Sequence, residues 1–333
     1  MKKYTHAWLA LKATQLLKSY QGKFNAERNQ RLKRLLKFLS PHPSTFVRGA
    51  WFPDTKIKDN CQGGHTWKYY LDPTNGRGER RRPPEHNRCL SFVQGNLHRK
   101  ISLDKRTSDL PDRCEALGQM IRDSTLITNK IGRGDMLIFN DSQIALFYLM
   151  LAHYISDAHV PVHCDKRDFY KPSHVHPDLE KFWEDEVKKH YQISTKREQF
   201  DLDEDGNLQR KTAQSSYEQS ILYKCDVILE QLEWQNMDTE DTNWNSLLGS
   251  GNNNFWDYLV SVCLVSFNMS LLLFSLDPPA GIDYNTVRIM DDPNFEPKVI
   301  EYSPDILADA VSSVALLWLA AWERWELLKQ GIR

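Results

Sequence analysis

The segment 153–163, with the sequence His-Tyr-Ile-Ser-Asp-Ala-His-Val-Pro-Val-His, contains the residue types and spacings best suited to chemistry. His153 and Asp157 are four positions apart, so in a helix they project from the same face. Apolar residues in the preceding turns share that face, and a buried ionisable group is costly unless it is paired or bound to a metal. Pro161 ends the helix and lets His163 return from a short loop, whereas His159 faces away and is expected to be structural. Imidazole and carboxylate ligands suit zinc, and an aspartate can bridge two ions.

A buried His–Asp ion pair with two surface histidines is the simpler interpretation of this segment. Further potential ligands elsewhere in the chain favour a metal site instead. His6 lies on the first predicted helix, and Asp54 and His65 lie in a long loop. The acidic pair Glu180 and Glu184 lies on the helix that follows the segment.

The order of these features resembles the zinc-dependent phospholipase C and S1/P1 nuclease superfamily. The resemblance covers a His-bearing first helix, a Pro-Asp loop, a further His, the H-x3-D-x5-H segment, and a helix with a Trp-acid pair. Its most specific part is Asp-Ala-His-Val-Pro-Val-His, within 153–163. The family implies an all-α fold in which three zinc ions lie at the bottom of a helical cleft.

Carried over by position, the resemblance implies a ligand set for each ion. The first ion would be held by Asp54, His65, His153 and Asp157. Asp157 would bridge to a second ion, which His6 and the free amino group of Met1 would also bind. Lys2 is bulky, so Met1 is expected to be retained.

The third ion would take His163 and two residues of the following helix. The family pattern is His-x3-acid with an aromatic residue before the acid. The pair Glu180 and Glu184 keeps the aromatic, Trp183, but has no histidine, and we prefer it here. The rival pair, His176 and Glu180, restores the histidine and loses the aromatic. Two to three zinc ions are therefore expected.

A zinc pair bridged by Asp157 would lower the pKa of a bound water and generate hydroxide for in-line attack on a phosphodiester. Asp157 and Asp54 are the residues that we assign to catalysis. The chain contains no GxSxG, no HExxH and no adjacent His-Asp dyad, which argues against serine hydrolases, zincins and HD phosphohydrolases.

Aromatic and basic residues that follow Asp54 predict the substrate. Cations interleaved with aromatic rings fit single-stranded nucleic acid, whose bases stack while its phosphates pair. The predicted substrate-binding residues are Lys56, Lys58, Trp67, Arg80, Arg81 and Arg82. A solvated basic loop and a site for a phospholipid headgroup, as in a phospholipase C, are the alternatives.

A third alternative belongs to another class: a non-catalytic helical interaction protein with one structural metal. The last predicted helix carries Trp318, Trp322 and Trp325, but such a stripe is more typical of a core than of a partner surface.

Helical periodicity dominates the rest of the chain. The predicted helices cover about 5–18, 26–39, 112–131, 142–159, 177–192, 214–237, 254–276 and 304–330. Residues 41–110 have little periodicity and are predicted to form a long structured loop. We predict one all-α domain over 1–333.

Composition limits the partners and the compartment. With 43 basic and 44 acidic residues in 333, the formal net charge is −1, so any phosphate-binding surface must be local. The first residues lack the apolar region and cleavage site of a secretory signal. The apolar run 255–276 contains Asp257 and several Ser and Asn residues, so no transmembrane segment is predicted. These features together predict a cytoplasmic protein.

Overall fold

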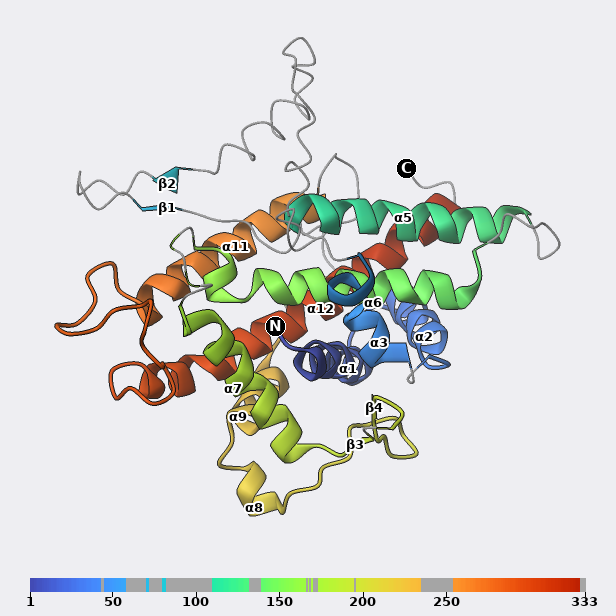
Figure 1. Ribbon diagram of the computed structural model, residues 1–333. Coiled ribbons are helices and arrows are strands. Elements are labelled where there is room, and N and C mark those ends of the chain that lie inside the picture. The colour runs from blue at the N-terminus through green and yellow to red at the C-terminus, as the bar shows by residue number, and fades with distance from the viewer. Residues whose placement is uncertain are drawn as a thin grey trace, which may run out of the picture.

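Helices make up most of the computed structural model (Figure 1). The strands in the described part of the chain form two pairs, and each strand has two residues. The structure describes residues 1–42, 45–57, 70–71, 80–81, 110–131, 139–165, 167, 169, 173–194, 196–234 and 254–329. The longer helices are α1 (Lys3–Ser19), α2 (Ala26–Leu39), α5 (Leu110–Ile131), α6 (Asp141–Ala158), α7 (Val175–His190), α9 (Ile221–Gln231), α11 (Asn254–Leu273) and α12 (Glu296–Lys329). The short elements are α3 (Phe46–Ala50), the π-helical turn η2 (Pro53–Ile57), the 3-10 turn η4 (Pro161–His163), α8 (Gln214–Tyr217), and the antiparallel pairs β1–β2 (Tyr70–Leu71, Arg80–Arg81) and β3–β4 (Ile193–Ser194, Gln199–Phe200).

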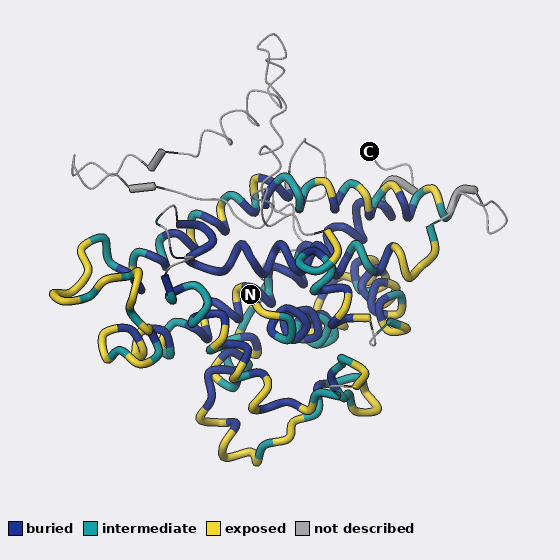
Figure 2. Tube along the Cα trace, in the orientation of Figure 1, coloured by how far each residue is buried: buried dark blue, intermediate teal, exposed yellow. Residues whose placement is uncertain are grey.

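The long helix α12 runs through the middle of the molecule and packs against α1, α5, α6 and α9. Buried positions follow α12, α6 and α1 on nearly every side (Figure 2). A helix that is apolar all round belongs in a core. These three helices therefore form the rigid frame on which the candidate site is built.

Helix α6 carries the segment singled out in the sequence. Its first turn is fixed by a capping box, in which the Asn140 side chain accepts from the Gln143 backbone N–H and the Gln143 side chain accepts from that of Asn140. Such a box satisfies two of the N–H groups that a helix start leaves without a partner. The helix ends at Ala158, and Pro161 then opens the turn η4 that contains His163.

The prediction of a mostly helical, all-α structure is confirmed, and the bounds of α2 match those predicted from the sequence. One predicted helix, 214–237, is instead two: α8 ends at Tyr217, and Ser220 caps α9 by accepting from the Tyr223 backbone N–H. The last helix begins at Glu296 rather than near 304, and Pro304 lies inside it. Pro304 is buried, so packing on both sides of it outweighs the hydrogen bond that a helical proline removes.

The loop predicted over 41–110 contains two helical pieces, α3 and η2, close to its start. Most of the remainder of that loop lies outside the described residues.

Among the described residues, two helices are long and apolar enough to cross a membrane by length and composition. The apolar window in α12 is 78% buried inside the structure, and the window Phe255–Leu273 in α11 is 44% buried. Core helices pass the same test, so neither window decides how the protein meets a membrane.

Candidate metal centre

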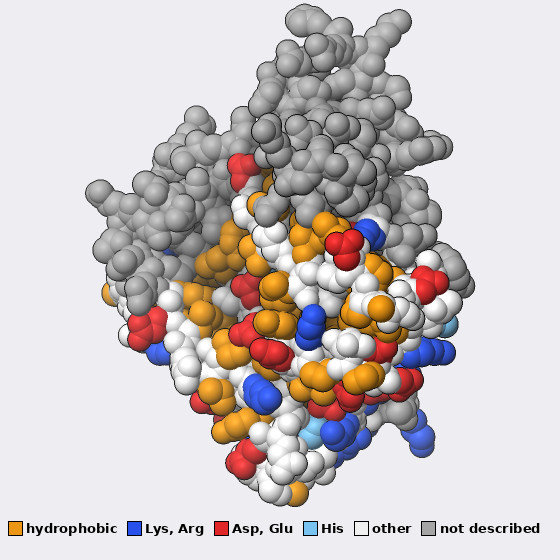
Figure 3. Space-filling view, turned by 90° about the vertical axis from the view of Figure 1, so that its left-hand side faces the viewer, with side chains coloured by type: hydrophobic (Ala, Val, Ile, Leu, Met, Phe, Trp, Pro, Cys, Tyr) orange, Lys and Arg blue, Asp and Glu red, His pale blue; other side chains and the backbone are white. Residues whose placement is uncertain are grey.

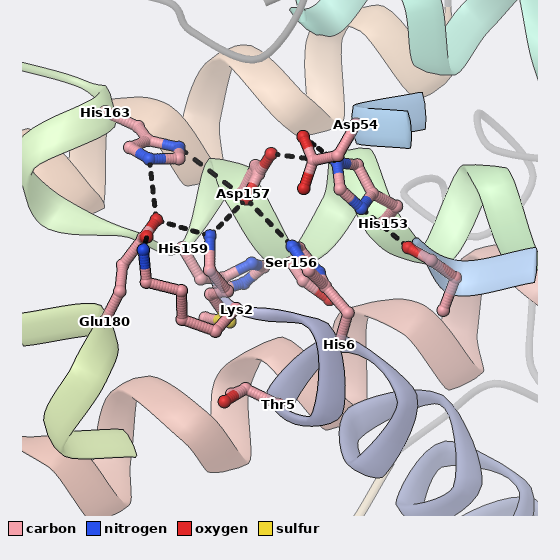
Figure 4. A network of polar contacts seen from close by, with 12 residues as sticks. Lys2, Thr5, His6, Asp54, His153, Ser156, Asp157, His159, His163 and Glu180 are labelled. Carbon is pink, nitrogen blue, oxygen red and sulfur yellow. Dashed lines mark hydrogen bonds and ion pairs between the residues drawn. The ribbon is translucent and has the colours of Figure 1, made fainter. Parts of the chain in front are cut away.

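Five segments of the chain bring their polar side chains together near the start of α1 (Figure 4). They are the first turn of α1, the turn η2, the last turns of α6, the turn η4 and the first half of α7. Asp157 lies in the middle, with His6, His153 and Asp54 on one side and His163 and Glu180 on the other.

Asp157 contacts ligand candidates on both sides. Its Oδ1 lies 3.5 Å from His6 Nε2 and 3.7 Å from His163 Nδ1, and its Oδ2 lies 3.3 Å from His153 Nε2. The carboxylate is 2% exposed. A buried carboxylate that reaches two sets of imidazoles has the arrangement needed to bridge two cations.

The first group of possible ligands is His6, Asp54 and His153, whose ligand atoms lie within 4.8 Å of one another. The rings of His6 and His153 are stacked with centroids 3.9 Å apart. His153 Nδ1 donates to the Ala50 carbonyl oxygen at 2.7 Å. This bond fixes the ring so that Nε2 turns towards Asp54 and Asp157, the orientation that a second hydrogen bond gives to metal-binding histidines.

The second group is His163, His176 and Glu180, again within 4.8 Å. His163 Nε2 lies 2.9 Å from His176 Nε2 and 3.3 Å from Glu180 Oε1, and His176 Nε2 lies 2.8 Å from the same oxygen. The geometry thus favours the pair His176 and Glu180, the rival in the sequence analysis. The pairing of Glu180 with Glu184, which we preferred, is not the one that the structure assembles.

Glu184 instead holds the start of α1. Its Oε2 accepts from the backbone N–H groups of Tyr4 and Thr5, both at 2.9 Å, and from Thr5 Oγ1 at 3.2 Å. The N-cap residue Lys2 has no side-chain cap bond, so a carboxylate from α7 satisfies the N–H groups that this helix start leaves open. Thr5, where the first predicted helix begins, is the third residue of α1.

The α-amino group of Met1 lies between the two halves of the site. It donates to Asp157 Oδ1 at 2.9 Å and contacts Glu180 Oε1 at 2.6 Å, and it is fully buried. Lys2 follows with a side chain that is 46% exposed and an Nζ 3.5 Å from Glu180 Oε2. Sequence reasoning proposed the amino group as a ligand but missed the Lys2 contact.

Burial and neighbouring charges set the protonation of these groups. Burial lowers the pKa of His6 well below 6.5 and that of His163 to about 4. Burial alone would raise the pKa of Asp157 and of Glu180, but the adjacent amino group and histidines lower both well below their ordinary values. Neutral imidazoles and ionised carboxylates are the forms that bind metals.

The same balance favours the protonated form of the Met1 amino group. Burial alone would lower its pKa, but Asp157 and Glu180 together raise it from 8.0 to about 11. A cation must displace that proton before the amino group can act as a ligand. In this structure the ammonium group itself neutralises the two carboxylates.

The donor set fits divalent zinc. Both ring nitrogens of His6 are buried without a hydrogen-bond partner in the described part of the chain, which is costly for a polar group unless another species satisfies it. Histidine nitrogens and carboxylate oxygens are zinc ligands. A buried set with this composition can hold a divalent cation.

Several predicted site residues cannot be placed. His65, Lys58, Trp67 and Arg82 lie outside the described residues, as do the side chains of Arg80 and Arg81 in β2. Lys56 is exposed on η2, two residues after Asp54. His159 points away from the centre, as expected: its Nδ1 donates to the Ile155 carbonyl oxygen at 2.8 Å, and its Nε2 lies 3.1 Å from Ser313 Oγ.

Comparisons of this chain with protein-family models, with curated proteins and with solved structures give no match. The function must therefore be argued from the geometry of the centre itself.

Proposed function

We propose that this protein is a zinc-dependent phosphodiester hydrolase with a fold of the phospholipase C and S1/P1 nuclease type, acting on single-stranded nucleic acid. The observation that carries the proposal is the pair of His-carboxylate groups on either side of the buried Asp157. Two cation sites joined by one carboxylate are a recurring arrangement for the hydrolysis of phosphate esters.

Each half of the centre would hold one ion. His6, Asp54 and His153 would bind the first, and His163, His176 and Glu180 the second, with Asp157 between them. The Met1 amino group, next to Asp157 and His6, would contribute to a further ion once deprotonated. Bound zinc would supply a water of lowered pKa and polarise the phosphoryl oxygens.

The protein's own residues would fix these ligands in place. The bond from His153 Nδ1 to the Ala50 carbonyl selects the tautomer in which Nε2 carries no proton. Lys2, beside Glu180, would neutralise a substrate phosphate that reached the second group. We assign Asp157 and Asp54 to catalysis, as in the sequence analysis.

Aromatic rings and cations beside the centre favour nucleic acid as the substrate. Lys3 Nζ lies 4.8 Å from the centroid of the Trp51 ring and 5.3 Å from that of Tyr4. Lys3 forms an ion pair with Glu198, and Lys188 forms one with Glu184, so a carboxylate partly balances each of these positive charges. Lys56 and Lys2 add exposed positive charge. Stacking faces next to cations are the means by which proteins hold single strands.

A phospholipid substrate has less support. An enzyme acting at a lipid surface needs exposed apolar side chains around its site. Among the described residues, the exposed large hydrophobic side chains are Ile57, Met120, Ile127, Val265 and Leu272. Only Ile57 belongs to an element of the centre, whereas the others lie on α5 and α11.

The test is cleavage of a labelled single-stranded oligonucleotide by purified protein, with added zinc and with a chelator. We expect cleavage that the chelator abolishes. Asp157→Asn should lower kcat/KM more than about a hundredfold, because even the outer partners of metal ligands are worth 10- to 100-fold. Asp226→Asn is the matched control, since Asp226 pairs with Lys12 away from the centre.

Two outcomes would contradict the proposal. Equal activity of Asp157→Asn and wild type would remove this centre from the reaction. A zinc-loaded protein that left oligonucleotides intact but hydrolysed phosphatidylcholine in mixed micelles would transfer the assignment to phospholipid.

A further inference from the structure

A cavity separate from the metal centre lies between α9, α11 and α12, and its floor is the C-terminal end of α6. Its volume is about 330 Å³, within the size range of pockets that hold small organic molecules. Most of its wall is apolar and includes Leu229, Val265, Met269 and Ile306. Val265 is 57% exposed, so the cavity opens along the outer side of α11.

The polar part of the wall carries negative charge. Asp305 and Asp309 line the cavity from α12, and their spacing of four residues places them on the same face of the helix. Both side chains are exposed carboxylates. Two like charges at this spacing destabilise a helix slightly. A positive charge bound near them would remove that repulsion.

The protein supplies little positive charge there. In the described part of the chain, no Lys or Arg forms an ion pair with Asp305 or Asp309. His159 contacts Asp309, with its Nε2 3.4 Å from Asp309 Oδ2. The same ring is also held by the Ile155 carbonyl and by Ser313 Oγ. The imidazole thus belongs to the floor, where it contacts one oxygen of Asp309 and leaves Asp305 for a bound cation.

We propose that this cavity binds a small hydrophobic cation, a molecule with a hydrocarbon body and a protonated amine. The body would replace water against Leu229, Met269 and Ile306, where burial of apolar area is favourable. The amine would lie between Asp305 and Asp309. This site is independent of the proposed phosphodiesterase activity.

A lipid bilayer fits this region less well. Anionic headgroups would be repelled by the two carboxylates. Figure 3 shows a face of the molecule on which hydrophobic side chains are interspersed with acidic and basic ones instead of forming a continuous apolar area. A cavity of bounded volume with two charges on one wall is better matched by a single small molecule.

The probe is octylammonium, compared with octanol and octanoate of the same chain length, titrated into the folded protein by calorimetry. We expect octylammonium to bind most tightly and octanoate most weakly. Binding of octylammonium, but not of octanol, should weaken as salt is added. In Asp305→Asn/Asp309→Asn, octylammonium should bind about tenfold more weakly, while octanol is unchanged.

Glu296→Gln is the matched control, because Glu296 is an exposed acid on α12 that does not line the cavity. Its affinity for octylammonium should equal that of the wild type. Asp305→Lys should reverse the preference towards octanoate. Equal affinity for the three probes, loss of octylammonium binding in Glu296→Gln, or no binding to folded wild type would overturn the proposal.

Discussion

The carboxylates of Asp157 and Glu180 owe their charge to their neighbours. Burial would favour the protonated forms, and the Met1 amino group and the surrounding histidines reverse that tendency. The same burial keeps His6 and His163 neutral. The neighbouring groups therefore hold the two carboxylates ionised, while burial keeps the two imidazoles neutral, and these are the protonation states in which such side chains bind a metal.

His176 decides between the two arrangements of the second group. His176→Ala should remove one equivalent of zinc and leave the other half of the site loaded, because His176 belongs to the group that it forms with His163 and Glu180. Metal content after dialysis, measured by mass spectrometry, gives the answer.

His174→Ala is the control for that change, since His174 is the neighbouring N-cap of α7 and makes no side-chain cap bond. Unchanged zinc content in His176→Ala would exclude His176 as a ligand. Loss of the same equivalent in His174→Ala would point to a general weakening of α7 instead.

Residue types and spacing predicted several of the side chains that meet at the candidate centre. His153 and Asp157 were predicted to share a helix face, and Pro161 to return His163 to the same place, and the structure brings all three together. The choice between Glu184 and His176 could not be made from the sequence. It depends on Glu184 accepting from the first-turn N–H groups of α1, a contact between residues about 180 positions apart.

At the scale of elements, α7 clamps the start of α1 with two carboxylates one turn apart. Glu180 contacts the Met1 amino group, and Glu184 accepts from the first-turn N–H groups. His6 lies on that same turn. The position of the ligands from α1 therefore depends on a helix that is distant in sequence.

We predict that Glu184→Ala lowers the free energy of unfolding by about 2 kcal/mol, because it leaves buried backbone donors without an acceptor. Glu184→Gln should lose less, since an amide oxygen can still accept. Urea denaturation of the metal-free protein measures both.

Asp185→Ala provides the comparison for Glu184→Ala, because Asp185 is exposed on the same helix and pairs only with Lys181 in the described structure. Its effect should stay within about 0.5 kcal/mol. If Glu184→Ala were as mild as this control, the capping role of Glu184 would be wrong.

Element boundaries followed from the sequence where capping signals were local. The Asn25 side chain accepts from the Arg28 backbone N–H at the start of α2, and the bounds of that helix were predicted correctly. The predicted bounds were wrong where contacts between residues distant in sequence determine the end of a helix. Pro304 suggested a helix start, yet the buried residues before it, such as Val299, extend α12 back to Glu296.

At the scale of the whole molecule, the end of α6 separates the metal centre from the acidic cavity. Asp157 faces the first and His159 the second. The carbonyl groups of Ile155 and Ala158 are held from the cavity side by His159 and Ser266. The two proposed sites, one for metal ions and one for hydrophobic amines, thus share one helix end.

The charges around this helix end predict how the stability of the metal-free protein depends on pH. Unfolded histidines take up protons below about pH 6.5, whereas folded His163 does so only near pH 4 and folded His6 also resists protonation. The unfolded chain then binds more protons, so stability falls as the pH drops from about 6.5 to 4. Asp157 and Glu180, whose folded pKa values are lowered, extend this loss to still lower pH.

The Met1 amino group acts in the opposite direction. Its pKa rises from 8.0 in the unfolded chain to about 11 in the folded one, so its contribution is full below pH 8 and is lost between about pH 8 and 11. Chemical denaturation with chelator present should therefore show greatest stability between about pH 6.5 and 8. His163→Gln should flatten the acid limb and leave the alkaline limb unchanged, because only the acid limb contains His163. An alkaline limb that was also flattened would mean that the Met1 amino group depends on His163 for its place between the two carboxylates.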